Sequence, residues 1–332
     1  MHRDDQLFGA RSAIQKGIRR GDLDLVHTSF NLLWSETKHR QWLRWRVTTL
    51  VTEEAWHFCG ELGKLLDSKT KEEKDWRQFL YRLCLATKNK DAVGLWYYLK
   101  FGGEDLEVLG HPEFEEMQFW RALATEEGDE SYLSVVDSMV DTYRRKARNL
   151  DEYEESALMA LHRRTKMGGM MGDRQICLSS MVLLYHRGVN EEEVMADVRA
   201  NAEKWKEKHG RKHPEEVEIP WYAFDMHTQA GKIALGIFMR RSAEKSRIDR
   251  DSFEATWFLL ESAKIPKELL RVVKVTDGST LGALDCAWWV PYVNVRLSQG
   301  KKTPKQLVHL WKTKMRDDIK GAVYWILGKR DK

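Results

Sequence analysis

The sequence predicts an all-α protein, built as an array of multi-helix bundles with additional C-terminal helices. Apolar residues recur at the 3.6-residue helical spacing through most of the 332 residues, and the best strand signal is the short run 272–275. Hydrophobic residues make up 42% and charged residues 32%, with six prolines. This balance is typical of a folded helical protein and argues against disordered, collagen-like and membrane-spanning classes.

Residues 9–34 predict two helices separated by a turn. Gly21 is suited to end the first helix, and Asp22 is suited to cap the start of the second. Residues 40–66 predict one continuous helix. Its apolar face comprises Leu43, Val47, Leu50, Val51, Ala55 and Phe58.

A polar connector at 68–74 precedes a further helical pair at 76–99, broken near 87–90. Helices are then predicted at 114–124, 132–147, 153–164, 174–187 and 190–208. Asn190 is placed as the N-cap of the last of these, ahead of three glutamates in its first turn. Three glycines in the methionine-rich run 167–172 predict a loop there, because glycine is unfavourable inside a helix.

The C-terminal third begins with an extended segment bracketed by Pro214 and Pro220. Helices are predicted at 229–243, 250–262, 266–274, 281–298 and 304–326, with Pro291 kinking or splitting the fourth. These elements suggest three consecutive domains, at 1–101, 114–209 and 214–332.

The charge is unevenly distributed along the chain. The formal net charge is +4, but residues 101–130 hold ten acids against one base, and residues 301–332 hold ten bases against three acids. The basic end suits DNA, or the acidic stretch of a neighbouring copy, while ordinary solvated helix faces would give the same pattern. Acidic residues near the start argue against a signal peptide, so we expect a cytoplasmic protein without membrane contact.

The four cysteines lie far apart, without a CxxC pair. This spacing argues against a disulfide framework or a zinc knuckle, and isolated thiols in helices are most often buried apolar groups. We therefore expect neither a metal nor a cofactor.

Three landmarks carry a resemblance to a known family. Residues 12–22 read SAIQKGIRRGD, residues 42–46 read WLRWR ahead of the acidic step 52–54, and residues 85–93 read LATKNKDAV. Over about residues 9–100 the chain thereby resembles the helical C-terminal region of the replication-associated recombination protein A family, AAA+ ATPases related to clamp loaders. The resemblance implies a clamp-loader-like collar, in which helical bundles join protomers into a homo-oligomer near DNA ends or forks.

The ATPase module of that family has no counterpart in this sequence. A phosphate-binding loop needs the spacing GxxxxGK followed by Ser or Thr. The Gly-Lys steps at 63, 231, 300 and 328 lack that context. We therefore expect no ATP hydrolysis by this chain.

The string 221–232, WYAFDMHTQAGK, concentrates several reactive groups at a loop-to-helix transition. Asp225 and His227 could ligate a metal, or the carboxylate could orient the imidazole as a base. Thr228 could cap the next helix, whose N-terminus would accept a phosphate, and Lys232 lies one turn further on. In the alternative interpretation, Asp225 or Thr228 is only a cap and His227 bonds a carbonyl.

Basic residues near aromatic and apolar ones are candidate phosphate contacts, because lysine and arginine bind nucleic-acid backbones whatever the base sequence. The candidates are Lys16, Arg19, Arg20, Arg44, Arg46, Arg163, Arg164, Lys312, Lys314 and Arg316. Such residues also serve as ordinary surface or helix C-terminal charges.

These features lead to one main hypothesis. It is a non-catalytic, oligomerising helical protein of DNA replication, recombination or repair, which binds DNA or a replication partner. The alternative is a metal-dependent or acid/base enzyme centred on Asp225 and His227.

Overall fold

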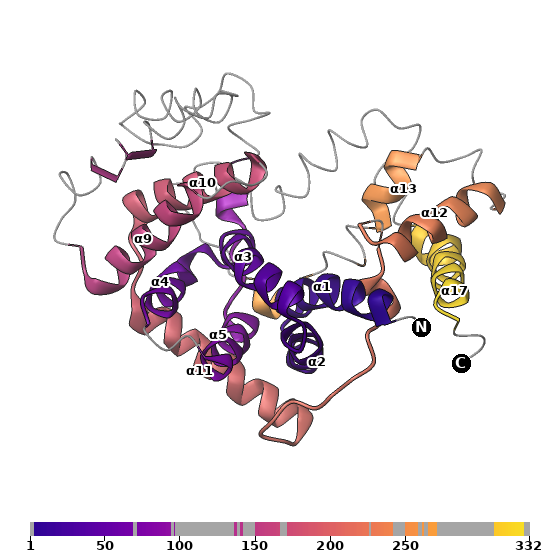
Figure 1. Cartoon of the computed structure of the whole chain (residues 1–332), viewed down its shortest axis with the longest axis horizontal. Helices are drawn as coiled ribbons and strands as arrows, with labels where there is room; N and C mark the ends of the chain where they lie inside the picture. The colour runs from indigo at the N-terminus through magenta and orange to yellow at the C-terminus, as the bar shows by residue number, and fades with distance from the viewer. Residues whose placement is uncertain are drawn as a thin grey trace. The chain divides into compact units, whose positions relative to one another are not determined.

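The described part of the chain is helical, as the sequence predicts (Figure 1). The computed structural model describes residues 3–68, 72–93, 96, 136–137, 140–141, 150–166, 171–225, 227–241, 250–257, 261, 265–270 and 309–328. Only two isolated bridges, and no strand, occur among these residues. No helix within them is long and apolar enough to cross a bilayer.

The chain forms two compact units, and each joins stretches that are distant in sequence. Unit 1 comprises Met1–Leu43, Lys212–Pro266 and Trp289–Lys332, and unit 2 comprises Arg44–Arg211 and Lys267–Trp288. Unit 1 therefore combines parts of the first and third stretches suggested by the sequence, and unit 2 takes parts of all three. The suggested boundary between 101 and 114 lies outside the described residues.

The first two helices and the turn between them are as predicted, except that the first helix begins at Arg3 rather than near residue 9. Helix α1 is Arg3–Arg20 and α2 is Leu23–Trp34, and the two pack against each other. Gly21, at φ 67°, ends α1, and the Asp22 carboxylate accepts a hydrogen bond from the backbone of Leu25. Gly17 lets the helices approach closely, because a Cβ there would lie 2.8 Å from a Val26 methyl.

Four apolar residues of the N-terminal region on which the collar interpretation depends are enclosed within one chain. Ile14, Ile18, Leu25 and Leu43 have no exposed surface. The collar interpretation needs apolar side chains in this region to join protomers, and these four cannot do so because they are already buried. Any association between copies therefore uses other surfaces.

The predicted continuous helix at 40–66 is wrong, because the chain breaks after Glu54. Helix α3 is Thr37–Glu54, a 3₁₀ turn spans Trp56–Phe58, and α4 is Cys59–Asp67. At the break, Ala55 (φ −158°, ψ 63°) forms a parallel bridge with Asn89, whose N–H donates to the Glu54 carbonyl at 2.8 Å. A partner far along the chain thus replaces the intrahelical bonds, and the apolar face continues across the break.

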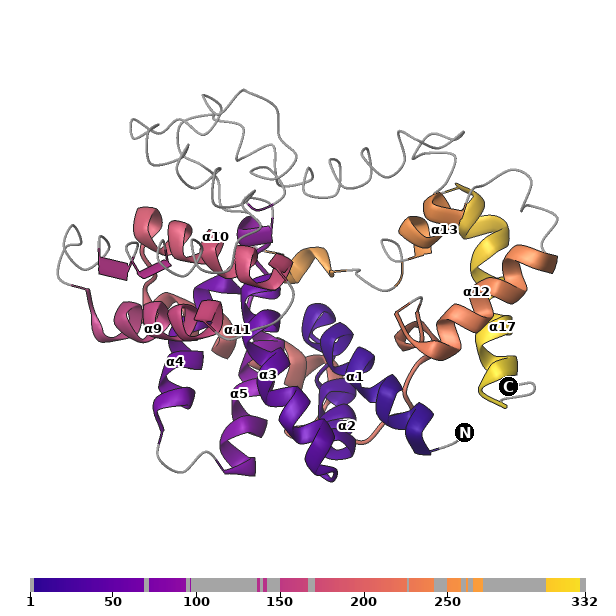
Figure 2. The same ribbon diagram turned by 45° about the horizontal axis from the view of Figure 1, so that its top comes forward.

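The remaining helices of unit 2 pack against one another and on α4 (Figure 2). Helix α5 is Glu73–Leu85, α9 is Glu152–Lys166, α10 is Met171–Arg187 and α11 is Glu191–His209. Helix α9 packs on α4 and α10, and α11 packs on α5.

Two sequence predictions for these helices have different outcomes. Asn190 caps α11, as predicted, by accepting from the Glu193 N–H. The loop predicted at 167–172 is too long, because 171 and 172 belong to α10 and only 167–170 lie outside the described residues.

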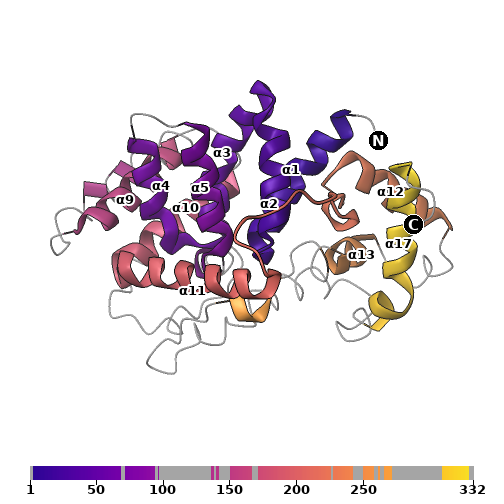
Figure 3. The ribbon, with the colours of Figure 1, turned by 90° about the horizontal axis from the view of Figure 1, so that it is seen from below.

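In unit 1, the C-terminal helices lie together (Figure 3). They are the 3₁₀ turn η3 (Trp221–Ala223), α12 (Gln229–Arg241), α13 (Arg250–Trp257), the π-helical η7 (Trp311–Met315) and α17 (Arg316–Ile326). Phe253 joins them, with its ring 4.3 Å from that of Phe238 and 6.0 Å from that of Trp311. The predictions for 114–124, 272–275 and 281–298, Pro291 included, lie outside the described residues, as does most of 132–147.

Candidate functional site

The string 221–232 forms a buried ion pair with α1. Asp225 is 2% exposed, and its Oδ2 lies 2.8 Å from Nζ of Lys16, which is 3% exposed. The same ammonium donates to the Ser12 hydroxyl at 2.7 Å and to the Ala223 carbonyl at 3.2 Å. Lys16 therefore joins η3 to α1 through these contacts. The prediction that Lys16 contacts a phosphate is corrected, because its ammonium is buried.

The charge on Asp225 is stabilised inside this contact. Burial alone would raise the pKa of Asp225, but the Lys16 ammonium and the contacts with His227 outweigh burial and hold it well below its usual range. The His227 backbone N–H donates to Oδ1 at 3.0 Å, and the His227 Nδ1 lies 3.3 Å from the same oxygen. The His227 ring itself is 65% exposed.

Asp225 and His227 are therefore neighbours, as an acid/base pair requires. The described residues contain no group of three or more His, Cys, Asp or Glu side chains placed to hold a metal ion. Because Asp225 already pairs with a buried lysine, its contacts are those of a structural carboxylate.

Thr228 is the cap of α12. Its hydroxyl accepts from the Gly231 N–H at 3.0 Å and donates to the Asp225 carbonyl at 2.8 Å. The predicted capping role of Thr228 is therefore confirmed, whereas phosphate binding at this helix N-terminus stays a prediction. Lys232, one turn into α12, is exposed.

Two arginines at the end of α1 are also committed within the chain. Arg19 is 9% exposed. The Arg20 guanidinium lies 3.9 Å from the centre of the Tyr222 ring and donates to the Glu261 carbonyl. Arg19 is buried and Arg20 is half-buried, so both guanidinium groups are mainly engaged within unit 1.

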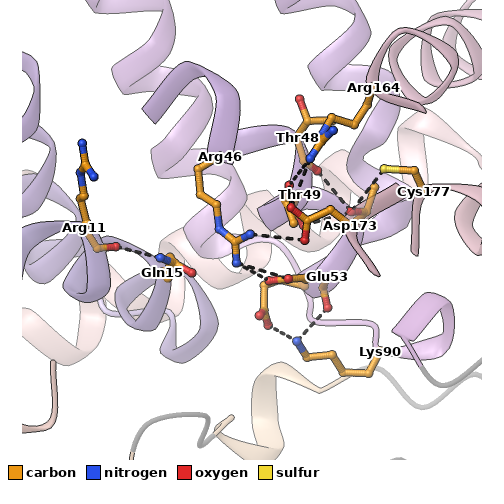
Figure 4. Close-up of polar contacts among 12 residues, drawn as sticks. Arg11, Gln15, Arg46, Thr48, Thr49, Glu53, Lys90, Arg164, Asp173 and Cys177 are labelled. Carbon is orange, nitrogen blue, oxygen red and sulfur yellow. Dashed lines mark hydrogen bonds and ion pairs between the residues drawn. The ribbon is translucent and has the colours of Figure 1, made fainter. Parts of the chain in front are cut away.

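Arg46 and Arg164 belong to an ion-pair network in unit 2 (Figure 4). Arg46 contacts both carboxylate oxygens of Glu53 at 3.3 Å and Asp173 at 3.6 Å. Arg164, 5% exposed, donates to Asp173 at 3.2 Å. The network links α3, α9 and α10, and in this structure both arginines pair with carboxylates of the same chain.

A second pair of opposite charges continues this network. Lys90 Nζ lies 2.5 Å from Glu54 and donates to the Glu53 carbonyl at 2.7 Å. Together the three cations and three carboxylates balance, so the network carries no net charge that would attract an anion.

The other predicted cations lie closer to solvent. Arg44 is exposed and lies 5.7 Å from the centre of the Trp76 ring, and Arg163 pairs with Asp67 at 2.7 Å. Arg316 pairs with Glu261 at 2.6 Å, and Lys312 is exposed. The side chain of Lys314 lies outside the described part.

The structure also brings together four side chains, here called the Arg11 cluster: Phe8 and Arg11 of α1 with His39 and Trp42 of α3. Only Trp42 was noted in the sequence, as part of the landmark 42–46. The Arg11 guanidinium lies 5.4 Å from the centre of the Phe8 ring and 4.7 Å from that of Trp42. Its Nε donates to His39 Nδ1 at 3.1 Å. Phe8 is 51% exposed.

Each half of this cluster has a sequence signal. Phe8 and Arg11 are three residues apart, as are His39 and Trp42, so each pair lies on one face of its helix. The contact between α1 and α3 at this position could not be predicted, because the sequence pattern of each helix says nothing about which helix packs beside it.

The two units differ in charge. Unit 1 contains 26 lysines and arginines against 17 aspartates and glutamates, whereas unit 2 contains 29 against 34. The basic excess of the chain therefore resides in unit 1, which also contains the Arg11 cluster.

Comparison of the chain with protein-family models, curated proteins and solved structures gave no match. Its function is therefore inferred from its own residues.

Proposed function

We propose that this protein is a non-catalytic, oligomerising helical protein of DNA replication, recombination or repair, and that unit 1 binds DNA. The observation that carries DNA binding is the basic excess of unit 1, 26 cations against 17 carboxylates. Nucleic-acid affinity arises largely from lysine and arginine releasing counterions from the phosphate backbone. Exposed cations in this unit include Lys38, Lys232 and Lys312.

The resemblance to the clamp-loader-like family supports the choice of DNA. Two of its landmarks, the acidic step ending at Glu54 and the turn around Asn89, contact each other through the bridge and the Glu54–Lys90 ion pair. Two segments that resemble one family therefore meet at one place in unit 2.

DNA binding is tested by fluorescence anisotropy with labelled duplex and single-stranded oligonucleotides across a salt series. We expect affinity to fall linearly on a log–log plot as salt rises, since phosphate contacts release counterions. No binding of either probe at low salt would remove DNA from the proposal.

A matched pair of charge reversals locates the binding surface. Lys232→Glu with Lys312→Glu should weaken binding at least about tenfold, because it removes two exposed cations and adds two anions in unit 1. Lys204→Glu with Lys208→Glu makes the same charge change at exposed positions of α11 in unit 2. Equal losses in both variants would contradict the assignment to unit 1.

A further inference from the structure

We infer that the Arg11 cluster binds single-stranded nucleic acid, with Phe8 stacking on an unpaired base and Arg11 binding a neighbouring phosphate. This inference rests on the proposed function, and it names the strand form and the residues that contact it.

Arg11 is arranged as a phosphate ligand. Two aromatic rings flank its guanidinium, and its Nε is occupied by His39, so the side chain is held before any ligand arrives. Its terminal amino groups donate no hydrogen bond to the described residues. Those groups form the planar donor pair that matches phosphate oxygens, and prior ordering lowers the entropic cost of binding.

Phe8 supplies the stacking surface. Half of its side chain is exposed, although a phenyl ring is an apolar group that folding normally buries. A base that stacks on this ring covers it, and stacking accepts any base because every base has an aromatic face. In a duplex the faces of each base are already stacked on their neighbours, so this ring favours an unpaired strand.

The positive charge of Arg11 and of unit 1 favours a nucleic acid over a protein as the molecule that covers this surface. An apolar protein partner would also cover Phe8, but it would not use the terminal N–H donors of Arg11. The basic excess of unit 1 adds long-range attraction for a polyanion. A second copy of unit 1 would bring a like charge to the same place.

The test compares affinities of the full-length protein for a labelled single strand of about 20 nucleotides and for a hairpin duplex, in low salt. Phe8→Ala should lower single-strand affinity about 5- to 150-fold and leave duplex affinity unchanged. Phe8→Trp should retain single-strand affinity, because the larger ring still stacks. Arg11→Gln should reduce the single-strand salt slope by about 0.7, the change expected for one lost phosphate contact.

Trp325→Ala is the matched control, since Trp325 is 59% exposed in the same unit and lies outside the cluster. It should bind as the wild type does. Circular dichroism checks that every variant keeps its helices.

A single-strand affinity unaffected by Phe8→Ala would overturn the inference and leave DNA binding in place. Equal losses for single strand and duplex would overturn the strand preference. If the wild type bound neither probe, the proposed function would fail as well.

A second readout gives the position of the base directly. A single strand that carries 5-iodouracil forms a photo-crosslink with an aromatic ring that stacks on it. After tryptic digestion, the crosslink should appear on the peptide 4–11, which contains Phe8. Crosslinks confined to other peptides would overturn the assignment.

Discussion

The Lys16–Asp225 ion pair shows how much can depend on two side chains. Both are almost fully buried, and each is the other's counter-charge at 2.8 Å. A buried charge without its partner costs several kcal/mol, because the interior does not solvate it as water does. Losing one partner of the pair should therefore weaken the packing of η3 against α1.

Replacing Asp225 with Asn should therefore lower the free energy of unfolding by about 3–5 kcal/mol, as measured by urea denaturation. His227→Ala should change it by less than about 0.5 kcal/mol, because the ring is mostly exposed and the backbone contact to Asp225 remains. Lys16→Met combined with Asp225→Asn should recover part of the loss. A large effect of His227→Ala would contradict the structural role assigned to this site.

The same pair predicts a pH dependence. The pKa of Asp225 in the folded protein lies below its unfolded value of about 3.9. The ionised carboxylate therefore contributes its full share of the folding stability at any pH above that value. As the pH falls, protonation of the carboxylate removes the contribution. The difference in stability between wild type and Asp225→Asn should therefore shrink below about pH 4. A difference that stays constant down to pH 2.5 would contradict the ion-pair explanation.

Among the elements, the end of α5 has a cap that comes from a lysine. Lys88 has no exposed surface, and its Nζ donates to the carbonyls of Leu83, Cys84 and Ala86 at 2.8, 2.9 and 2.6 Å. The last carbonyls of a helix have no donor within the helix, so this ammonium satisfies groups that would otherwise be buried unpaired. Burial lowers the pKa of Lys88 to about 8.

Lys88→Met should destabilise the protein by about 1–3 kcal/mol at pH 7, because buried carbonyls lose their donor. Lys74→Met, at an exposed position in the first turn of α5, is the control and should have little effect. The pKa of Lys88 is about 8 in the folded protein and about 10.4 in the unfolded chain. At a pH between these two values, Lys88 is more fully protonated in the unfolded chain than in the folded protein. Raising the pH from 7 to 10 should therefore stabilise the wild type relative to Lys88→Met, as measured by thermal unfolding.

The elements also show where sequence reasoning succeeds. Asp22, Asn190 and Thr228 were predicted as caps or possible caps, because a cap depends on residues two or three positions away. The break at Ala55 was missed because its partner, Asn89, lies far along the chain. An apolar face that continues across a break looks like one helix in the sequence.

The candidate site follows the same division. Sequence identified the string 221–232 as chemically unusual, and the structure brings Asp225 and His227 together. It did not anticipate Lys16 as the partner of Asp225, since a lysine on an amphipathic helix normally reaches solvent. The Arg11 cluster was also missed, because it forms only where two helices meet and the sequence pattern of each helix does not show that contact.

At the scale of the whole molecule, the proposed association of copies has its own test. The resemblance implies an oligomer, whereas Ile14, Ile18, Leu25 and Leu43 are buried in one chain. Light scattering coupled to size-exclusion chromatography should give a multiple of 39.0 kDa if the collar proposal is right. A mass of one chain at micromolar concentration would remove oligomerisation and leave DNA binding to stand alone.

The assembly of unit 1 from distant stretches has a consequence for biosynthesis. Lys16 donates a hydrogen bond to the carbonyl of Ala223, 207 positions further along the chain. While the ribosome makes that intervening chain, α1 and α2 exist without the segment that later neutralises the Lys16 ammonium. Contacts of such long sequence separation form slowly. Until the last third of the polypeptide emerges, the nascent N-terminal helices lack the segment that packs on them. During that time they are accessible to chaperones and proteases.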